Sequence, residues 1–312
     1  MMLWLNLNNL AVRFLSMELW MLLAAGSALG WAFVVLLDKF VIDSEIDNAM
    51  GTGGLHAMFN CLAVAIVSVV IGGFSFSLPV LGAGLILGVL YVLANYFWFS
   101  GVGEEEVSRF APVLSFDVAF IAILSFIFLQ QSFTLPVYGG MALTIIGCVL
   151  ISLEDPMESL SRIKSKWALI AALASAFTYS VREVFFQHVS TGIDIWSLLF
   201  FYGVAGSVFS LVLVFKARKD LVGKLEGVEH MVLSGLVSGG SQAVFFLAVS
   251  LGSASLVSTI TKTRFLVIFF AATAISRLHP EVIHEPLEKR ILVQKLVATA
   301  MIITGVLAAT VL

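Results

Sequence analysis

Charged residues are scarce in this chain of 312 residues: Asp, Glu, Lys and Arg together account for 12% of it. In a typical soluble domain about a quarter of the residues are charged. Hydrophobic residues make up 60% of the chain, and its mean hydropathy is +1.05. This composition argues against a soluble globular domain and indicates an integral membrane protein.

Cysteine is also scarce, with only Cys61 and Cys148, and both lie in the middle of apolar runs. We interpret them as buried thiols and not as a disulfide. The sequence has no basic tract, which argues against a nucleic-acid partner. It has no P-loop, which argues against ATP as the energy source, and no Ser–His–Asp arrangement or nucleophile elbow. We therefore predict neither an enzyme active site nor a cofactor.

Long apolar runs fill the chain. A membrane-spanning helix needs about 20 mostly apolar residues. The ten candidate spans are 18–41, 49–72, 79–101, 107–129, 134–153, 167–189, 195–216, 230–251, 255–276 and 291–312. In the bilayer, only helices and closed barrels satisfy all backbone polar groups, and unbroken apolar runs of this length indicate helices. We predict an all-α integral membrane fold with ten transmembrane helices.

An N-terminal extension, residues 1–17, precedes the first span and is too polar to cross the membrane. One interpretation is a helix at the membrane interface, because Leu3, Leu7 and Leu10 would share a face. The other is that the first sixteen residues are dispensable and that Met17 is the natural start. We favour the second interpretation.

The two halves of the sequence resemble each other. An offset of 147 residues aligns the first five predicted helices with the second five, without a gap from Trp20 to Ser276. Beyond Ser276 the offset becomes 158, so that Gly147 pairs with Gly305. Because five is an odd number, the second copy enters the membrane from the opposite side. We predict an inverted repeat of residues 18–153 and 167–312, joined by a linker over 154–166, a plan typical of secondary transporters.

Two stretches carry a resemblance to a known family: ELWMLLAAGSALGWAF (18–33) and FLQQSFTLPVYGGMALTIIGCVLI (128–151). The chain resembles the drug/metabolite transporter superfamily, in particular its EamA type, over about residues 18–312. The resemblance implies ten helices, transport activity and a cavity walled by helices 1, 3, 4, 6, 8 and 9. Two departures stand out. Gln130-Gln131 replace the family's usual Gly-Glu, and Val118 and Phe265 replace a common Pro in helices 4 and 9.

Asp117 lies in the middle of the fourth predicted helix, and the offset of 147 pairs it with Arg264 in the ninth. An unpaired charge at the bilayer centre costs about 2.5–3.5 kcal/mol or more. Because the resemblance implies that helices 4 and 9 face each other, we predict an ion pair between Asp117 and Arg264. Either this pair is a fixed clamp, or it opens so that Arg264 binds an anionic group and Asp117 exchanges a proton. We favour the second interpretation, because buried ion pairs stabilise poorly.

Lys262 is a second cation in the ninth helix. Two residues correspond to about 200° of rotation around a helix, so Lys262 and Arg264 cannot face the same partner. The position equivalent to Lys262 is Ser115, so symmetry offers it no acidic partner. Lys262 either binds an anionic substrate group or pairs with a carboxylate that symmetry does not identify.

Polar and aromatic side chains follow one face of several predicted helices, as Ser175, Tyr179 and Arg182 do in the sixth. Lipid cannot satisfy the hydrogen-bonding groups of Tyr91, Asn95 and Gln242. Together with the charged residues they predict a polar cavity, which Trp31 and Tyr179 either line or simply support by packing. The predicted substrate-binding residues are Asp117, Lys262, Arg264, Asn95, Gln242, Tyr91, Tyr179 and Trp31. For His56 and Asn60 of the second helix we predict hydrogen bonds across a helix interface.

Two features lie between the predicted spans. The segment HPEVIHEPLEKR (279–290) gathers His279, Glu281, His284 and Glu285, but it lacks a metal-binding motif, and we interpret it as a solvated loop. Lys and Arg cluster in the loops after odd-numbered helices, which places both termini outside the cell by the positive-inside rule. The resemblance implies termini inside.

The sequence therefore predicts a secondary transporter in the cell (plasma) membrane, acting by alternating access as a monomer or homodimer. Its substrate would be a small polar organic molecule with an anionic group, such as an amino acid, an organic acid or a phosphorylated solute. Protons are one candidate coupling ion, and the lipid bilayer is its other partner. The alternatives are a membrane-embedded enzyme acting on a lipid-linked substrate and a non-transporting membrane subunit.

Overall fold

The computed structural model describes residues 19–38, 49–102, 111–152, 165–221, 225–278 and 289–311. All regular elements in these ranges are helical. They are the first helix (Leu19–Asp38), α2 (Ala49–Ile71), α3 (Leu78–Val102), the 3-10 helix η1 (Ala111–Phe116), α5 (Asp117–Leu129), α6 (Leu135–Ser152), α8 (Lys166–Ser190), α9 (Ile195–Leu221), α10 (Leu225–Leu251), α11 (Ala254–Thr261), α12 (Arg264–Leu278) and α13 (Lys289–Val311). The N-terminal extension 1–17 and the candidate metal ligands of 279–285 lie outside the described residues.

The predicted membrane fold is confirmed. Within the described ranges, nine helices are long and apolar enough to cross a bilayer, and the shorter apolar segment Val113–Leu129 matches the remaining predicted span. Large apolar side chains point outward along these helices, and Leu135, for example, is 85% exposed. Such an exposed apolar surface suits contact with lipid.

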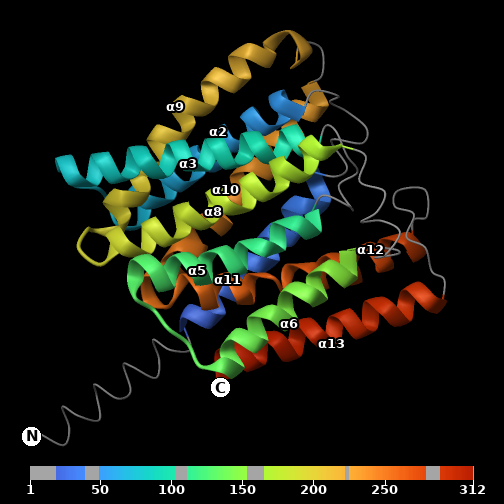
Figure 1. Cartoon of the computed structure of the whole chain (residues 1–312). Coiled ribbons are helices and arrows are strands. Elements are labelled where there is room, and N and C mark those ends of the chain that lie inside the picture. Colours follow the sequence, from blue (N-terminus) through green and yellow to red (C-terminus); the bar gives the residue numbers. More distant parts are fainter. Residues whose placement is uncertain are drawn as a thin grey trace, which may run out of the picture.

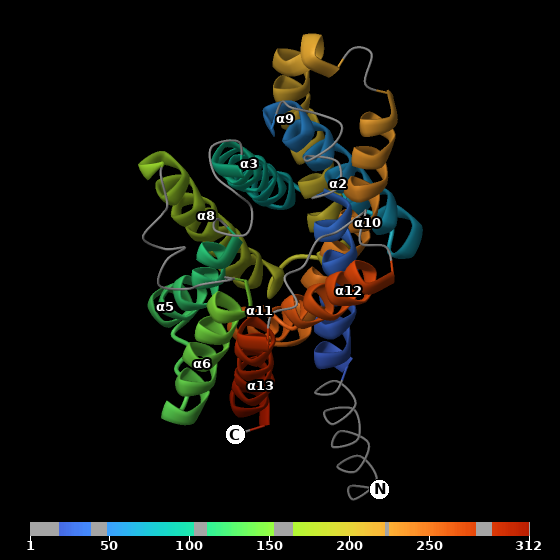
Figure 2. The same ribbon diagram turned by 90° about the vertical axis from the view of Figure 1, so that its right-hand side faces the viewer.

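Helices at equivalent positions in the two halves pack side by side, α2 against α9 and α6 against α13 (Figures 1 and 2). Each pair runs antiparallel. In α6, Gly140 lies against Gly305 and Ala309 of α13, whereas the later residue Gly147 lies against the earlier residue Ala298. A Cβ atom on Gly140 would lie 2.6 Å from the carbonyl oxygen of Gly305, so the two backbones meet where only glycine fits.

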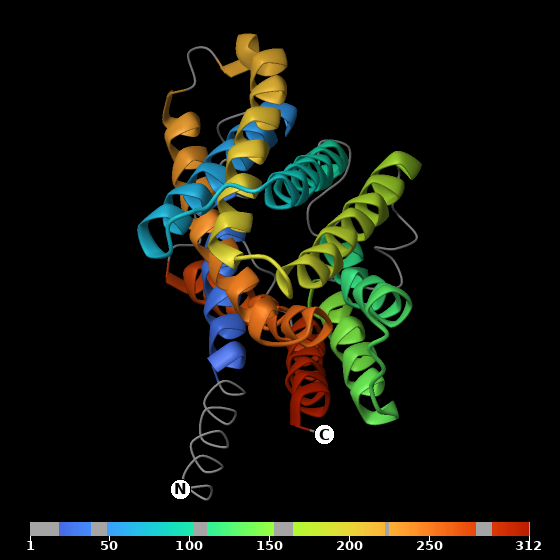
Figure 3. The same ribbon diagram turned by 90° about the vertical axis from the view of Figure 1, so that its left-hand side faces the viewer.

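α9 lies at one end of the molecule, and α6 and α13 lie at the opposite end (Figures 2 and 3). Between these ends the centre of the molecule is rich in aromatic side chains. Phe186 stacks on Phe246, whose ring also meets Tyr202 edge-on. All three side chains are fully buried, which fixes α8, α9 and α10 around the middle of the protein.

The fourth and ninth spans are interrupted, which the apolar pattern did not predict. The fourth is a 3-10 helix that becomes α-helical at Asp117, and the ninth breaks after Thr261 and resumes at Arg264. Near the second break, the hydroxyl groups of Thr261 and Thr263 donate hydrogen bonds back to carbonyl groups three residues earlier. Such bonds compete with the regular helical ladder and bend helices. Asp117 and Arg264 are equivalent under the offset of 147 residues, so both halves change helical geometry at the same place.

Candidate functional site

A cavity of about 160 Å³ lies in the middle of the protein. Its walls come from the helices that the resemblance implied, and α2 also contributes, through His56. A volume of this size holds on the order of ten water molecules or a small solute. The cavity brings together all eight residues predicted from the sequence, namely Trp31, Tyr91, Asn95, Asp117, Tyr179, Gln242, Lys262 and Arg264.

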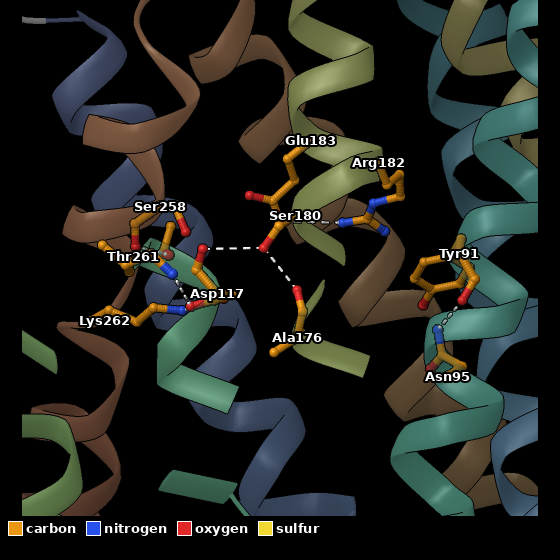
Figure 4. A network of polar contacts seen from close by, with 11 residues as sticks. Tyr91, Asn95, Asp117, Ala176, Ser180, Arg182, Glu183, Ser258, Thr261 and Lys262 are labelled. Atoms are coloured by element: carbon orange, nitrogen blue, oxygen red, sulfur yellow. Dashed lines mark hydrogen bonds and ion pairs between the residues drawn. The ribbon is translucent and has the colours of Figure 1, made fainter. Parts of the chain in front are cut away.

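Asp117 pairs with Lys262, so the predicted pair of Asp117 with Arg264 is wrong. The Lys262 Nζ atom donates to Asp117 Oδ2 over 2.6 Å, and the two side chains point toward each other in Figure 4. Lys262 is only 1% exposed. Lys262 and Arg264 have different partners, as the rotation argument predicted, but the pairing suggested by the offset of 147 residues does not hold. The carboxylate that symmetry did not identify for Lys262 is therefore Asp117.

Two backbone contacts hold Asp117 in place. Its Oδ1 atom accepts a hydrogen bond from the backbone N–H of Val118 over 2.7 Å. Its own carbonyl oxygen accepts one from the Ser180 hydroxyl of α8 over 3.1 Å (Figure 4). Asp117 thus joins α5, α8 and the break in the ninth span.

Arg264 lies against aromatic rings instead of a carboxylate. Its guanidinium carbon is 5.7 Å from the ring centre of Trp31 and 5.5 Å from that of Phe265. Both distances fall within the range of cation–π attraction. Arg264 is half-buried and lines the cavity.

The two predicted amide side chains occupy equivalent positions but differ in their contacts. The Asn95 Nδ2 atom donates to the carbonyl oxygen of Tyr91 in its own helix over 3.0 Å. Gln242 is 2% exposed, and its Nε2 atom has no hydrogen-bond partner among the described residues. Gln242 therefore presents a buried donor that a ligand could use.

Arg182 and Glu183 of α8 also line the cavity. The sequence placed Arg182 on the same helix face as Tyr179, but neither residue was among the predicted substrate-binding residues. Arg182 is 1% exposed and its guanidinium carbon lies 4.9–5.2 Å from the ring centres of Tyr179, Tyr91 and Phe246. Its Nη2 atom is 3.6 Å from Glu183 Oε1, beyond hydrogen-bond distance. Two adjacent charges inside an apolar span are the sequence signal that could have identified this pair.

Part of the Arg182–Glu183 pair has no partner in the described part of the chain. The Nε and Nη1 atoms of Arg182 are buried without a hydrogen-bond partner, and so is the Oε2 atom of Glu183. Buried polar groups are normally satisfied, so each exception calls for an explanation.

A third polar cluster lies where the first helix meets α2 and α10. The Ser234 hydroxyl donates a short hydrogen bond to Asp38 and lies 3.1 Å from the His56 Nδ1 atom. The Asn60 Nδ2 atom donates to the Ser238 hydroxyl over 2.8 Å. The predicted hydrogen bonds of His56 and Asn60 across a helix interface are confirmed, whereas the sequence did not place Asp38 and His56 at the cavity.

The formal charges around the cavity cancel. Among the described residues that line it, Asp38, Asp117 and Glu183 are acidic and Arg182, Lys262 and Arg264 are basic. No group of three or more His, Cys, Asp or Glu side chains in the described ranges could hold a metal ion.

Comparisons with known proteins address the fold and the family. Residues 18–153 match the EamA-like transporter family. A segment of 123 residues is 26% identical to an uncharacterized transporter of Methanothermobacter thermautotrophicus, and it covers 39% of this chain but only 35% of that protein. A protein known from its crystal structure shares the fold with a TM-score of 0.72 at 15% identity, over 94% of this chain and 96% of its own.

The family match covers the first five spans, and the structural match extends the fold over nearly the whole chain. Both agree with the resemblance noted in the sequence and with the many apolar helices. The chain is thus a multi-pass integral membrane protein, and its residues 18–153 are similar to the EamA-like transporter family.

Proposed function

We propose that this protein is a secondary transporter of the cell membrane that moves a small polar organic solute with an anionic group by alternating access. The observation that carries the proposal is the central cavity, which gathers six charged side chains of the described apolar helices, five of them away from the helix ends that face the loops. Charged groups at this depth are expensive, and in membrane proteins they usually mark a substrate or ion pathway.

Alternating access needs two states of similar energy, and an inverted repeat would supply them. We infer that residues 18–153 and 167–312 are the two copies. Two contact patterns support this. The equivalent helices α6 and α13 run antiparallel, and their contacts exchange: Gly147 lies against Ala298 and Ile302, and Gly305 lies against Gly140 and Thr144. An offset of 158 residues converts one set into the other, as expected around a two-fold axis.

The residues that line the cavity would have different roles in transport. The guanidinium group of Arg264 lies against aromatic rings at the cavity wall, so it is available to attract an anionic group into the cavity. The Lys262–Asp117 pair ties the ninth span to the fourth and would act as a gate between the halves. Asn95 and Gln242 would orient the solute, and the rings of Trp31, Tyr91 and Tyr179 would form its walls.

Counterflow into proteoliposomes tests this function. Vesicles preloaded with an unlabelled amino acid, dicarboxylate or sugar phosphate would receive the labelled compound outside. We expect saturable accumulation for at least one of the three classes, and loss of that accumulation in Arg264→Gln. The matched control is Arg218→Gln, because Arg218 is exposed in the last turn of α9 and does not line the cavity. No accumulation in any class would contradict the proposal.

A further inference from the structure

The two ion pairs of the cavity are unequal. Asp117 and Lys262 are joined by a hydrogen bond of 2.6 Å, so each already has a strong partner. Arg182 and Glu183 stand 3.6 Å apart, and both keep buried atoms without a partner among the described residues. A ligand can therefore engage Arg182 without first breaking a charge-assisted hydrogen bond.

Every unpartnered nitrogen in this region is a donor. Arg182 offers its Nε and Nη1 atoms and Gln242 offers its Nε2 atom, and both residues line the same cavity. A guanidinium group has no acceptor, so its ligand must present acceptor oxygens. Carboxylate and phosphate groups have the charge and geometry that Arg binds best. The surrounding rings of Tyr91, Tyr179 and Phe246 shield the guanidinium from water, which strengthens such a contact.

An anion alone would upset the balance of charge. Among the described residues that line the cavity, acids and bases are equal in number, so a bound anion adds one uncompensated negative charge inside the membrane. If the anion takes Arg182, Glu183 also loses its cationic neighbour while its Oε2 atom still lacks a partner. A buried charge that has lost its partner is strongly destabilising, and a carboxylate avoids this by taking up a proton.

On these grounds, and assuming the transport function proposed above, we propose that an anion and a proton enter the cavity together: Arg182 and Gln242 donate hydrogen bonds to the oxygens of a carboxylate or phosphate group, and Glu183 binds the proton. For a singly charged anion, the balance is one anion in, one proton in, and one carboxylate converted to a neutral carboxyl group. The net charge of the cavity is the same before and after.

Other titratable groups around Glu183 are less suited to take the proton. On the elements packed against α8 they are Tyr91 of α3, Asp117 of α5, and Lys262 and Arg264 of the ninth span, while η1 contributes none. Of these, only Asp117 is an acid, and its Oδ2 atom already accepts a hydrogen bond from Lys262. Further along the cavity wall, the Asp38 carboxylate accepts a hydrogen bond from Ser234.

The test uses the purified full chain in detergent with acetate and inorganic phosphate as probes. Binding is followed by tryptophan fluorescence, because Trp31 and Trp98 line the cavity. Proton uptake on acetate binding is followed with an indicator dye in weakly buffered solution. We expect saturable binding of at least one probe, uptake of about one proton per acetate, and a Kd that rises up to about tenfold per pH unit as the pH increases.

Three variants sharpen the test. Glu183→Gln mimics the protonated carboxyl group, so it should bind acetate without proton uptake and with a Kd independent of pH. Arg182→Gln should lose binding at least about tenfold, Arg182→Lys should retain part of it, and Arg218→Gln should bind like the wild type. If a variant does not fold, the pH dependence of the wild-type Kd still decides the question.

Several results would overturn the proposal. These are no saturable binding of either probe to the wild type, proton uptake that persists in Glu183→Gln, and proton uptake that disappears in Asp38→Asn instead. Binding with proton uptake but without flux in proteoliposomes would contradict the transport function and leave this site intact. Flux without proton uptake would contradict this site alone.

Discussion

The first helix and α8 occupy equivalent places in the two halves of the chain, but only α8 carries charges in the middle of its span. With the offset of 147 residues, Val35 and Leu36 correspond to Arg182 and Glu183. Likewise, the fourth span becomes α-helical at an acid, Asp117, and the ninth resumes at a base, Arg264. The comparison teaches that the two halves share a backbone plan and packing contacts, whereas the polar chemistry of the cavity is divided unequally between them.

The largest expected effect comes from breaking the hydrogen-bonded ion pair between Asp117 and Lys262. Lys262→Met leaves Asp117 buried without its cation, and breaking a buried pair typically costs about 3–5 kcal/mol. Thermal unfolding in detergent should therefore show a marked fall in Tm. Asp117→Asn combined with Lys262→Met should recover much of the loss, because no charge is then left unpaired. The control is Lys219→Met in the last turn of α9, and a double variant no more stable than Lys262→Met would refute this reasoning.

The next largest effect is expected on transport. It comes from a double variant that gives α8 the residues of the first helix at these two positions. In the double variant Arg182→Val with Glu183→Leu, stability should change little, because apolar residues often replace a buried ion pair without loss. Flux or anion binding should fall at least about thirtyfold, because contacts of a buried charge are worth about 2 kcal/mol or more. Counterflow and Tm measured on the same preparation check both parts. Unchanged flux would show that the asymmetry of the two helices has no role in transport.

A smaller effect tests the similarity of the halves. Gly147→Ala and Gly305→Ala place equivalent Cβ atoms against the facing helix, where the nearest atoms allow no ordinary contact. Overpacking of this kind costs about 1–3 kcal/mol, and the two variants should lose similar amounts of stability. Gly139→Ala is the control, because nothing lies within 4 Å of its Cβ position. Strongly unequal losses in thermal unfolding would mean that the contacts are not equivalent.

The smallest effect concerns a hydrogen bond present in one half only. The Ser175 hydroxyl of α8 donates to the carbonyl oxygen of Ala94 in α3 over 2.9 Å, and the equivalent residue of the first helix is Ala28. Ser175→Ala should therefore lower stability by only about 0.6 kcal/mol, the average for such bonds between membrane helices. A loss several times larger in denaturant titration would show that Ser175 does more than join two helices.

The sequence predicted the spans well because an apolar run of about 20 residues has few other uses. It also predicted which residues meet in the cavity, because polar side chains in such runs must turn away from lipid. It failed on the partner of Asp117, because the offset pairs Asp117 with Arg264, whereas the hydrogen bond is made by Lys262 in the break of the ninth span. The pattern of apolar residues in the sequence does not predict that break.

Arg182 and Glu183 were left out of the predicted binding residues for a different reason, although Arg182 was placed on the same helix face as Tyr179. The comparison of the two halves emphasised charges that face each other across the repeat, and the first helix has only Val35 and Leu36 at these positions. Such a comparison does not identify a charged residue whose equivalent in the other half is apolar. Their contacts with Tyr91 and Tyr179 depend on how the helices pack, which only the structure shows.

The cancellation of charge around the cavity has a consequence for energetics. Moving one elementary charge across a membrane potential changes the free energy by about 2.3 kcal/mol per 100 mV. With three acids and three bases among the described residues that line the cavity, the formal charges at this site cancel in the unloaded protein. Its reorientation between the two faces of the membrane would therefore proceed at a rate nearly independent of voltage, and only the cargo would decide whether the cell's electrical gradient drives the cycle.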